Sequence, residues 1–252
     1  MSLEAFQLNG KIALVTGSRR GIGAAIALAL AQAGADIACH GLNSDPGSVC
    51  EEICALNRRC AYFDADVTDP QACSILFDNV ISKFGRLDIL INDAAYNVSI
   101  PFGDLDNLTL EVWNRIMATN LTGPMRLTKA VAPIMKAQGR GRIVNIASVA
   151  GLSPTGSSIA YAVSKAGLIH LTRCMAVALA PETLVNCVAP GLLDGTRATA
   201  NLRSEQIERS ASSSLLKRPA DKDDCADMVV AMCRTETMTG QTVVIDSGRI
   251  FH

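Results

Sequence analysis

Apolar, strand-like runs alternate with helical patterns along almost the whole chain. This alternation is typical of a parallel sheet covered by helices on both faces. The strand candidates are residues 11–16, 35–40, 60–66, 87–92, 141–148, 184–190 and 241–246. The helical stretches include residues 21–33, 46–57, 70–84, 111–138, 160–180 and 222–234. No linker or repeat interrupts the pattern, so the sequence predicts a single α/β domain over residues 1–252 with one seven-stranded, doubly wound parallel sheet.

The composition points to a protein that binds a small molecule. Of its 252 residues, 49% are hydrophobic and 19% charged, and 23 basic against 24 acidic side chains give a net charge of −1. This balance lacks the positive surface that a nucleic acid or an acidic membrane would attract. The sequence has no signal-peptide pattern and no run of about 18 uninterrupted apolar residues that would suggest a membrane helix. We therefore expect a soluble protein with no nucleic-acid or membrane partner.

Nine cysteines raise the question of a metal site or of disulfide bonds. Cys50, Cys54 and Cys60 lie close together, and His40 precedes them. However, no C-x-x-C pair occurs, and no second ligand pair follows at zinc-finger spacing. The sequence thus predicts no metal site. An odd number of thiols without a signal peptide is typical of the reducing cytoplasm, which is the expected location.

A glycine-rich loop follows the first strand candidate. Gly17, Gly21 and Gly23 stand between that strand and a helix, with the spacing G-x-x-x-G-x-G. This context allows a tight turn, a close backbone approach and helix N-terminal amides that face an anion, as a dinucleotide phosphate requires. The loop also supplies Ser18, Arg19, Arg20 and Ile22.

The choice of dinucleotide can be partly predicted. NAD enzymes usually place an acidic residue about 20 positions beyond the glycines, to hold the ribose 2′-hydroxyl. Gly41 stands there instead, while Arg19 and Arg20 could face a 2′-phosphate, so the sequence favours NADP(H) over NAD(H). The possible ribose ligands Asp45, Asn43 and His40 leave this choice open.

Two further segments have candidate roles. Asp66 ends the third strand candidate and could either meet an adenine ring or form a helix cap. Asp69 and Pro70 are predicted at the N-cap and first position of the next helix. Residues 191–217 form an unusually long connection after a strand, so we expect a substrate-covering loop rather than a surface excursion without a role.

Tyr161 and Lys165 stand four positions apart in a segment with little else that titrates. In a helix this spacing puts both side chains on one face. A phenol has a pKa of about 10, and a neighbouring ammonium favours the phenolate, so Lys165 is expected to lower the pKa of Tyr161. Tyr161 would then act as a general acid and base.

Several motifs, in this order and at these intervals, resemble those of the classical short-chain dehydrogenases/reductases over essentially the whole chain. They are "TGSRRGIG" at 16–23, "DVTD" at 66–69, "NDAA" at 92–95, "MATNLTG" at 117–123, "GRIVNIASVAG" at 141–151, "YAVSK" at 161–165, "VNCVAPG" at 185–191 and "TGQTVVIDSG" at 239–248. The resemblance implies a Rossmann-like fold, a nicotinamide cofactor, a homotetramer, and an enzyme that interconverts a secondary alcohol and a ketone. It implies the catalytic tetrad Asn120, Ser148, Tyr161 and Lys165. The implied cofactor-binding residues are Gly17, Ser18, Arg19, Arg20, Gly21, Ile22, Gly23, Asp66, Val67, Asn92, Ala94, Tyr161, Lys165, Pro190 and Gly191.

The chain departs from the family pattern in places that matter for the cofactor. Asp93 and Ala95 stand where asparagine and glycine are usual, beside the expected cofactor. Thr196 stands a residue or two later than the family's usual threonine, which leaves its role open. The connections before residue 184 and near residues 232–241 also look shortened, away from the chemistry.

Alternative functions remain to be weighed. A catalytically silent NADP(H)-binding sensor or scaffold of the same fold would typically lose the tyrosine or lysine, and this chain keeps both. Dehydratases and epimerases among the extended relatives have a longer C-terminal part, and an enoyl reductase spaces its tyrosine and lysine further apart. The substrate pocket is expected to mix apolar and hydrogen-bonding groups, which favours a neutral alcohol or ketone. Its candidate lining residues are Tyr96, Asn97, Leu152, Ser153, Leu192 and Leu193, and Arg197 and Arg203 on the long loop would change that preference if they turned inward.

Overall fold

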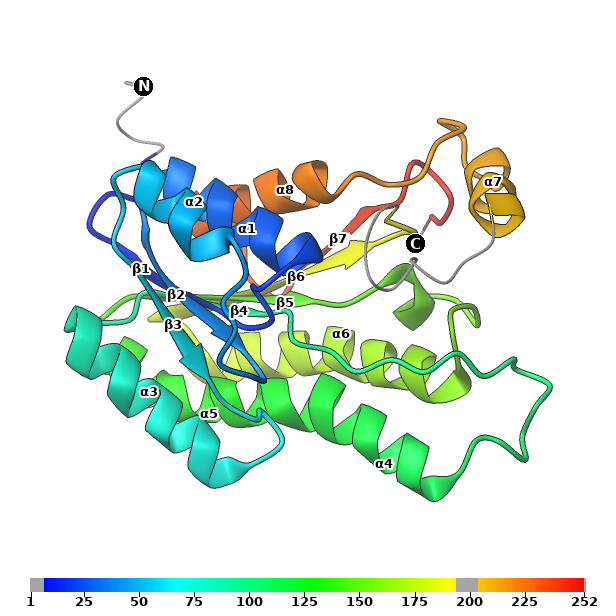
Figure 1. Cartoon of the computed structure of the whole chain (residues 1–252), viewed down its shortest axis with the longest axis horizontal. Helices are drawn as coiled ribbons and strands as arrows, with labels where there is room; N and C mark the ends of the chain where they lie inside the picture. Colours follow the sequence, from blue (N-terminus) through cyan, green and yellow to red (C-terminus); the bar gives the residue numbers. More distant parts are fainter. Residues whose placement is uncertain (1–6, 194–203, 252) are drawn as a thin grey trace.

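In the computed structural model, which describes residues 7–193 and 204–251, seven parallel strands form one sheet (Figure 1). The strands are β1 Ile12–Val15, β2 Asp36–Gly41, β3 Cys60–Asp64, β4 Ile89–Asn92, β5 Gly141–Ile146, β6 Thr183–Pro190 and β7 Thr242–Ile245. Their order across the sheet is β3-β2-β1-β4-β5-β6-β7. The predicted doubly wound, Rossmann-like sheet is confirmed, and each strand lies within or next to its predicted range.

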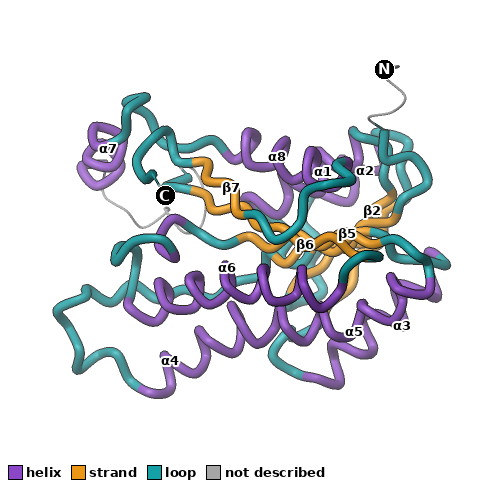
Figure 2. Tube along the Cα trace, turned by 180° about the vertical axis from the view of Figure 1, so that it is seen from behind, coloured by secondary structure: helices purple, strands orange, loops and turns teal. Residues whose placement is uncertain are grey.

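Helices cover both faces of this sheet (Figures 1 and 2). The helices on one face are α1 Gly21–Gln32, α2 Val49–Ala55 and α8 Lys222–Arg234. Those on the other face are α3 Pro70–Phe84, α4 Leu110–Met117, α5 Gly123–Ala137 and α6 Ile159–Leu179. As predicted, the Asp69 side chain caps α3 by accepting a hydrogen bond from the Gln71 amide, with Pro70 at the first helical position.

The strands are continuous apolar runs because both of their faces are buried. Along β1, Ala13 and Val15 pack into the core beneath α1 and α8, whereas Ile12 and Leu14 pack into the core beneath α3 and α5. The central strand β4 divides its side chains between the same two cores. Side chains that alternate between two apolar layers hold the register of the sheet, and so fix where each strand ends.

Two helical features differ from the sequence prediction. The predicted helix 111–138 is interrupted by the π-helical turn η2 (Ala118–Thr122), which joins α4 to α5. The predicted loop 191–217 contains a helix, α7 (Ser204–Ser213), while residues 194–203 lie outside the described part of the chain. Thr196, Arg197 and Arg203 lie in or at the end of that gap, so their predicted roles are not addressed by the structure.

Helix α6 is the one helix among the described residues that is long and apolar enough to cross a membrane, with a mean hydropathy of 1.2 in its most apolar window. Its inner side chains, Ala160, Leu168, Ile169 and Ala176, are buried in the protein. A core helix of this kind has the same composition as a membrane span, and the expectation of no membrane partner stays a prediction.

The sheet order places the candidate site. Neighbouring β1 and β4 lead to connections that leave in opposite directions across the sheet, which makes their carboxyl ends the topological switch point. Ligands of open α/β sheets bind in the crevice outside that point. The glycine loop follows β1 and Asp93 follows β4, so both stand at this crevice.

Candidate active site

The glycine loop closes over the end of β1 and is held there by two neighbouring strands. Thr16 is buried, donates to the Ile91 carbonyl 3.1 Å away, and accepts from the amides of Asp93 and Ala94 at 3.0 and 3.1 Å. These bonds tie the end of β1 to the end of β4. Gly17 and Gly21 have φ values of +71° and +61°, a left-handed conformation that favours glycine.

His40 clamps the loop from β2. Its backbone amide donates to Ser18 Oγ at 2.9 Å, its carbonyl accepts from the Ser18 amide at 3.0 Å, and its Nδ1 accepts from the Gly17 amide at 3.4 Å. Its Nε2 lies 3.1 Å from the Ala65 carbonyl. Burial lowers the pKa of His40 to about 4, so the ring is neutral at physiological pH. Because both ring nitrogens are engaged, His40 is a support of the loop rather than the ribose ligand that the sequence left open.

The first turn of α1 fits a dinucleotide phosphate. Arg20 precedes it in an extended conformation, no side chain caps its free amides, and no acidic residue stands in the turn. A Cβ built on Gly21 would meet nothing within 4 Å, whereas one on Gly23 would lie 2.5 Å from the Gly17 carbonyl oxygen. The loop is therefore packed against its own helix and open in front, which suits an anion held by helix N-terminal amides.

The other predicted cofactor residues near this crevice differ in exposure and in the contacts that they make. Asp66 is exposed, and its Oδ1 accepts from the amide and the hydroxyl of Thr68, so the carboxylate stabilises the turn before α3. Val67 is buried against Gly123 of α5. A Cβ added to Gly123 would lie only 3.2 Å from the Val67 side chain. Pro190 ends β6, and the Gly191 amide donates to the Ile245 carbonyl at 2.8 Å.

Helix α6 brings two predicted catalytic residues to the end of β5. Ser158 caps the helix by accepting from the Tyr161 amide at 3.2 Å, which sets Tyr161 in its first turn and Lys165 one turn later. The Ser148 side chain lies near enough to the Tyr161 phenol to lower the pKa of that phenol, against the effect of burial. Ser148 also accepts from the Ala150 amide at 3.2 Å, at the start of the 3-10 turn η3 (Val149–Gly151). Tyr161 and Ser148 can thus reach the same substrate oxygen.

The predicted effect of Lys165 on Tyr161 is wrong for this structure. Burial raises the pKa of Tyr161 to about 12, with the Ser148 side chain opposing and Asp93 adding to this rise. The Lys165 ammonium lies 5.7 Å from the centre of the Tyr161 ring and donates to the Ile146 carbonyl at 2.7 Å. Burial also lowers the pKa of Lys165 to about 8. Burial is the largest influence on the pKa of Tyr161, Lys165 is not among the groups that shift it, and the phenol is protonated at neutral pH.

Asn120 lies in the π turn and connects three parts of the site. Its Oδ1 accepts from the Tyr96 amide at 2.8 Å, and its Nδ2 donates to the Tyr96 carbonyl at 3.0 Å. Nδ2 also lies 3.2 Å from Ser164 Oγ, which itself donates to the Tyr161 carbonyl at 2.7 Å. Asn120 therefore couples the loop after β4 to the turn of α6 that carries Tyr161.

Asn92 and Asn145 form a buried polar line beneath the site. Asn92 Nδ2 donates to Asn145 Oδ1 at 2.8 Å, and Asn145 Nδ2 donates to Thr172 Oγ1 at 2.9 Å. Asn92 Oδ1 has no protein partner within the described chain. Asn145 was not among the predicted site residues, although the motif that contains it was recognised.

Asp93 is a buried carboxyl at the crevice whose change of charge the sequence did not predict. Its Oδ2 lies 2.5 Å from where a Cβ on Gly23 would stand, so the carboxyl packs against the glycine loop. Burial raises the pKa of Asp93 to about 7, and the Lys165 ammonium opposes that rise. The signal was present as a departure from the family motif at residue 93. A carboxyl that changes charge near neutral pH thus stands between the glycine loop and Lys165.

We expect Asp93→Asn to change how stability depends on pH. The folded-state pKa of Asp93 lies above its ordinary value near 4, so the wild-type protein loses folding free energy as the pH rises from about 4 to about 7. The amide has no charge to desolvate. The variant should therefore gain stability relative to wild type at pH 8, and much less at pH 5, in urea unfolding. Asp78→Asn, which removes an exposed carboxylate on α3, is the control. Equal differences at both pH values would contradict the burial of the Asp93 charge.

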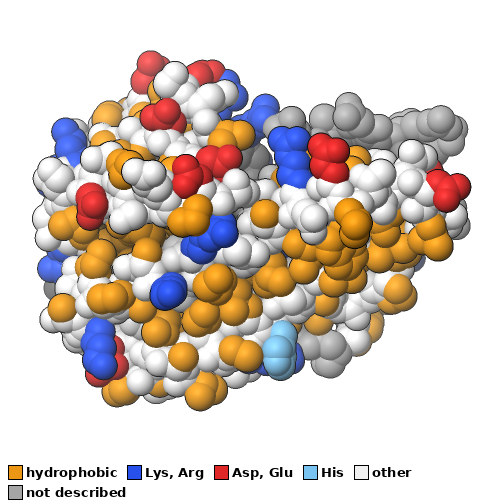
Figure 3. All heavy atoms as spheres, turned by 90° about the horizontal axis from the view of Figure 1, so that it is seen from below, with side chains coloured by type: hydrophobic (Ala, Val, Ile, Leu, Met, Phe, Trp, Pro, Cys, Tyr) orange, Lys and Arg blue, Asp and Glu red, His pale blue; other side chains and the backbone are white. Residues whose placement is uncertain are grey.

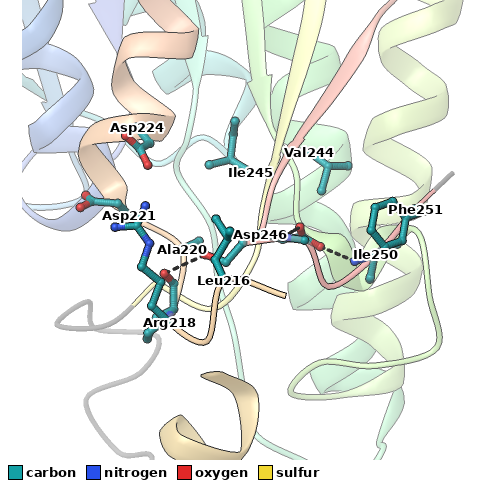
Figure 4. A pocket seen from close by; sticks show the side chains of 13 residues that line it. Leu216, Arg218, Ala220, Asp221, Asp224, Val244, Ile245, Asp246, Ile250 and Phe251 are labelled. Atoms are coloured by element: carbon teal, nitrogen blue, oxygen red, sulfur yellow. Dashed lines mark hydrogen bonds between the residues drawn. The ribbon is translucent and has the colours of Figure 1, made fainter. Parts of the chain in front are cut away.

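A separate hollow of about 480 Å³ lies at the far edge of the sheet (Figure 4). It is formed by β7, the start of α8 and the C-terminal segment, and Asp246 holds that segment by accepting from the Ile250 amide at 2.7 Å. None of the four predicted catalytic residues lines it. The hollow is therefore distinct from the crevice that contains Tyr161.

Comparison with known proteins identifies the family to which the chain belongs. The sequence profile of the family described as "Enoyl-(Acyl carrier protein) reductase" matches residues 17–249. Human dehydrogenase/reductase SDR family member 4 is 34% identical over 257 residues, covering 96% of this chain and 88% of that protein. The chain belongs to the short-chain dehydrogenase/reductase family. The 3-oxoacyl-acyl-carrier-protein reductase of Thermotoga maritima is another relative, 32% identical over 248 residues, with 97% of this chain and 99% of that protein covered.

Solved structures of short-chain dehydrogenases/reductases superpose closely. A 7α-hydroxysteroid dehydrogenase complexed with NADH and 7-oxo glycochenodeoxycholic acid has a TM-score of 0.92 and 30% identity, with 98% of this chain and 97% of that chain covered. A gluconate 5-dehydrogenase from Burkholderia cenocepacia complexed with NADP and tartrate has a TM-score of 0.92 and 27% identity, with 99% and 98% covered. This short-chain dehydrogenase/reductase is accordingly an NAD(P)-dependent oxidoreductase that interconverts alcohols and ketones. The sensor alternative is thereby set aside.

Proposed function

We propose that this protein is a cytoplasmic carbonyl reductase that uses NADP(H) to reduce a neutral ketone to a secondary alcohol. The observation that supports this chemistry is the position of the half-buried Tyr161, in the first turn of α6 beside Ser148 at the end of β5. A phenol is protonated at neutral pH, so Tyr161 can donate the proton that ketone reduction requires. When bound, the nicotinamide supplies the hydride. Tyr161 gives its proton to the carbonyl oxygen, and the Ser148 hydroxyl hydrogen-bonds that oxygen as negative charge develops on it.

The other two residues of the proposed tetrad act around this transfer. Lys165 is anchored on the Ile146 carbonyl and holds a positive charge, with a pKa of about 8, beneath the crevice. Asn120 accepts a hydrogen bond from the Tyr96 amide and donates one to Ser164 of α6, and so fixes the position of the loop after β4 relative to that helix. We assign Lys165 to cofactor binding and proton replenishment, and Asn120 to positioning. An assay of nicotinamide absorbance at pH 7 with a panel of ketones, alcohols and an enoyl thioester tests the proposal. Turnover of the enoyl thioester alone, or faster alcohol oxidation than ketone reduction, would contradict it.

The preference for a neutral ketone rests on the groups around the expected substrate position. Asn97 hydrogen-bonds Ser157, and Ser153 lies 3.0 Å from Thr155, so both offer polar groups without charge. Leu193 is buried against Ala220. One charge does approach the site, because the Arg115 guanidinium stacks 4.0 Å from the centre of the Tyr96 ring. We include residues 191–217 in the proposed site as a cover over the substrate.

The cofactor preference rests on the end of β2. A Cβ built on Gly41 would lie 2.1 Å from the Tyr62 hydroxyl, so this position has little room for the acidic side chain of an NAD enzyme. Arg20 is exposed beside the crevice, and Arg19 forms an ion pair with Asp45. These guanidinium groups favour a ribose 2′-phosphate.

We expect the double variant Arg19→Gln/Arg20→Gln to raise the dissociation constant of NADP(H) at least about tenfold. This corresponds to about 1.4 kcal/mol, the size of one or two charge-assisted hydrogen bonds. The dissociation constant of NAD(H) should change little, because NAD(H) has no 2′-phosphate. Fluorescence titration with both cofactors measures the two effects. Equal weakening of both cofactors would mean that the arginines do not distinguish them.

We also propose the homotetramer of the family. The outer face of α3 to α6 carries a broad band of hydrophobic side chains (Figure 3). Val177 on α6 and Leu110 on α4 are 83% and 78% exposed, and Val163 is 41% exposed. Apolar surface of this kind is typical of a subunit interface. Light scattering should give a molar mass of four chains in solution, and a monomer would refute this part.

A further inference from the structure

Three cysteines from three different elements meet beneath helix α2. Cys39 comes from β2, Cys60 from the neighbouring strand β3, and Cys50 from the first turn of α2. The Cys60 sulfur lies 3.0 Å from that of Cys50 and 3.7 Å from that of Cys39. All three sulfur atoms lie within 4.8 Å of one another. The pairing of β2 with β3, and the packing of α2 beside them, therefore brings three thiols to one point.

The distances fit one shared ion. A thiolate binds zinc at about 2.3 Å, so two sulfur atoms on one ion stand about 4 Å apart. The two separations of 3.0 and 3.7 Å lie just below that value, and small side-chain rotations would widen them to it. Cys39 is buried and forms the floor of the cluster, whereas Cys50 and Cys60 are partly exposed and leave a path to solvent. An accessible path is a requirement for metal uptake.

The donor set is all sulfur. No carboxylate belongs to the group within the described residues. His40, adjacent to Cys39, has both ring nitrogens engaged, and Cys54 is exposed on the next turn of α2, outside the cluster. Structural zinc sites are almost always tetrahedral with four protein ligands, so a set of three thiols lacks one.

Soft thiolate ligands select soft cations, and Cu(I) accepts three sulfur ligands without a fourth. We propose that Cys39, Cys50 and Cys60 form a three-thiolate site for one thiophilic cation, with Cu(I) as the ion that fits it best. The site stands apart from the tetrad, on the face of the sheet covered by α1 and α2. The proposal departs from the sequence prediction of no metal site, because Cys39 joins Cys50 and Cys60 only through the pairing of β2 with β3, while Cys54 and His40 stay outside the cluster.

The test is a competition titration of the reduced, metal-free, full-length protein under anaerobic conditions. Cu(I) is supplied as its acetonitrile complex in the presence of bathocuproine disulfonate, and ultraviolet sulfur-to-copper absorption reports binding. We expect one Cu(I) per chain. Loss of a supporting group around a metal ligand costs about 10–100-fold in affinity, so loss of a ligand itself should cost at least about 100-fold. Cys39→Ser, Cys50→Ser and Cys60→Ser should each show that loss.

Cys54→Ser is the matched control, because Cys54 lies on the same helix outside the cluster. It should bind Cu(I) as the wild-type protein does. Circular dichroism checks folding, and the partly exposed Cys50→Ser decides the question if the buried Cys39→Ser fails to fold. Three results would overturn the proposal: binding unchanged in Cys50→Ser, equal loss in Cys54→Ser, or tighter binding of Zn(II) than of Cu(I). Recovery of a metal-free Cys50–Cys60 disulfide from cells lysed with a thiol-blocking reagent would also overturn it.

Discussion

Tyr161→Phe should lower kcat for ketone reduction by about 10²- to 10⁴-fold, the usual contribution of a positioned acid or base. The substitution deletes one hydroxyl and keeps the aromatic ring in the first turn of α6. Only the contact of that hydroxyl with Ser148 is lost from the folded protein, at a cost of about 1 kcal/mol. Cofactor affinity should stay within about twofold of wild type, since a change of that size is well below 1 kcal/mol.

Single-turnover kinetics, together with a cofactor titration, separates the chemical step from binding in this variant. Thermal unfolding provides the control for folding. A variant that keeps more than about a tenth of the wild-type kcat would remove Tyr161 from the role of proton donor. Loss of cofactor binding together with activity would instead make it a structural residue of the crevice.

Gly23→Ala should abolish most cofactor binding. A Cβ at this position would lie 2.5 Å from both the Gly17 carbonyl oxygen and the Asp93 carboxylate. Alanine stabilises an ordinary helix interior by about 0.5–1 kcal/mol relative to glycine. Overpacking against a backbone oxygen costs about 1–3 kcal/mol, so the clash outweighs that gain. The loop must shift away from α1, and the dissociation constants of both NADP(H) and NAD(H) should rise at least about tenfold.

Gly103→Ala is the matched control for this glycine. A Cβ there would meet nothing within 4 Å, and the residue is exposed without a left-handed backbone. It should leave cofactor affinity and thermal stability unchanged. Isothermal titration and thermal unfolding of the two variants check the pair. Normal cofactor affinity in Gly23→Ala would mean that the close packing of the loop on α1 is not required.

The sheet was predictable because its strands are buried on both faces and so appear in the sequence as separate apolar runs. The joint arrival of Ser148, Tyr161 and Lys165 at one crevice followed from the family motifs. Three details were not predictable. The hydrogen-bond partner of the Lys165 ammonium depends on which backbone carbonyl lies beside it after folding. The charge state of Tyr161 depends on burial, which sequence spacing does not report. The third thiol of the cysteine cluster depends on the pairing of β2 with β3.

The π turn at Ala118–Thr122 makes the position of Asn120 sensitive to the loss of a residue during evolution. The position of the Asn120 side chain is set by the local winding of the chain as well as by its identity. Removing one residue from this turn would restore regular helical winding and swing the asparagine about 100° around the axis relative to one flank. Such a sequence would still contain all four residues of the proposed tetrad. However, the side-chain amide of Asn120 would no longer reach the Tyr96 backbone in the loop after β4. Gaps of one residue here are therefore as informative about loss of function as substitutions at the catalytic positions.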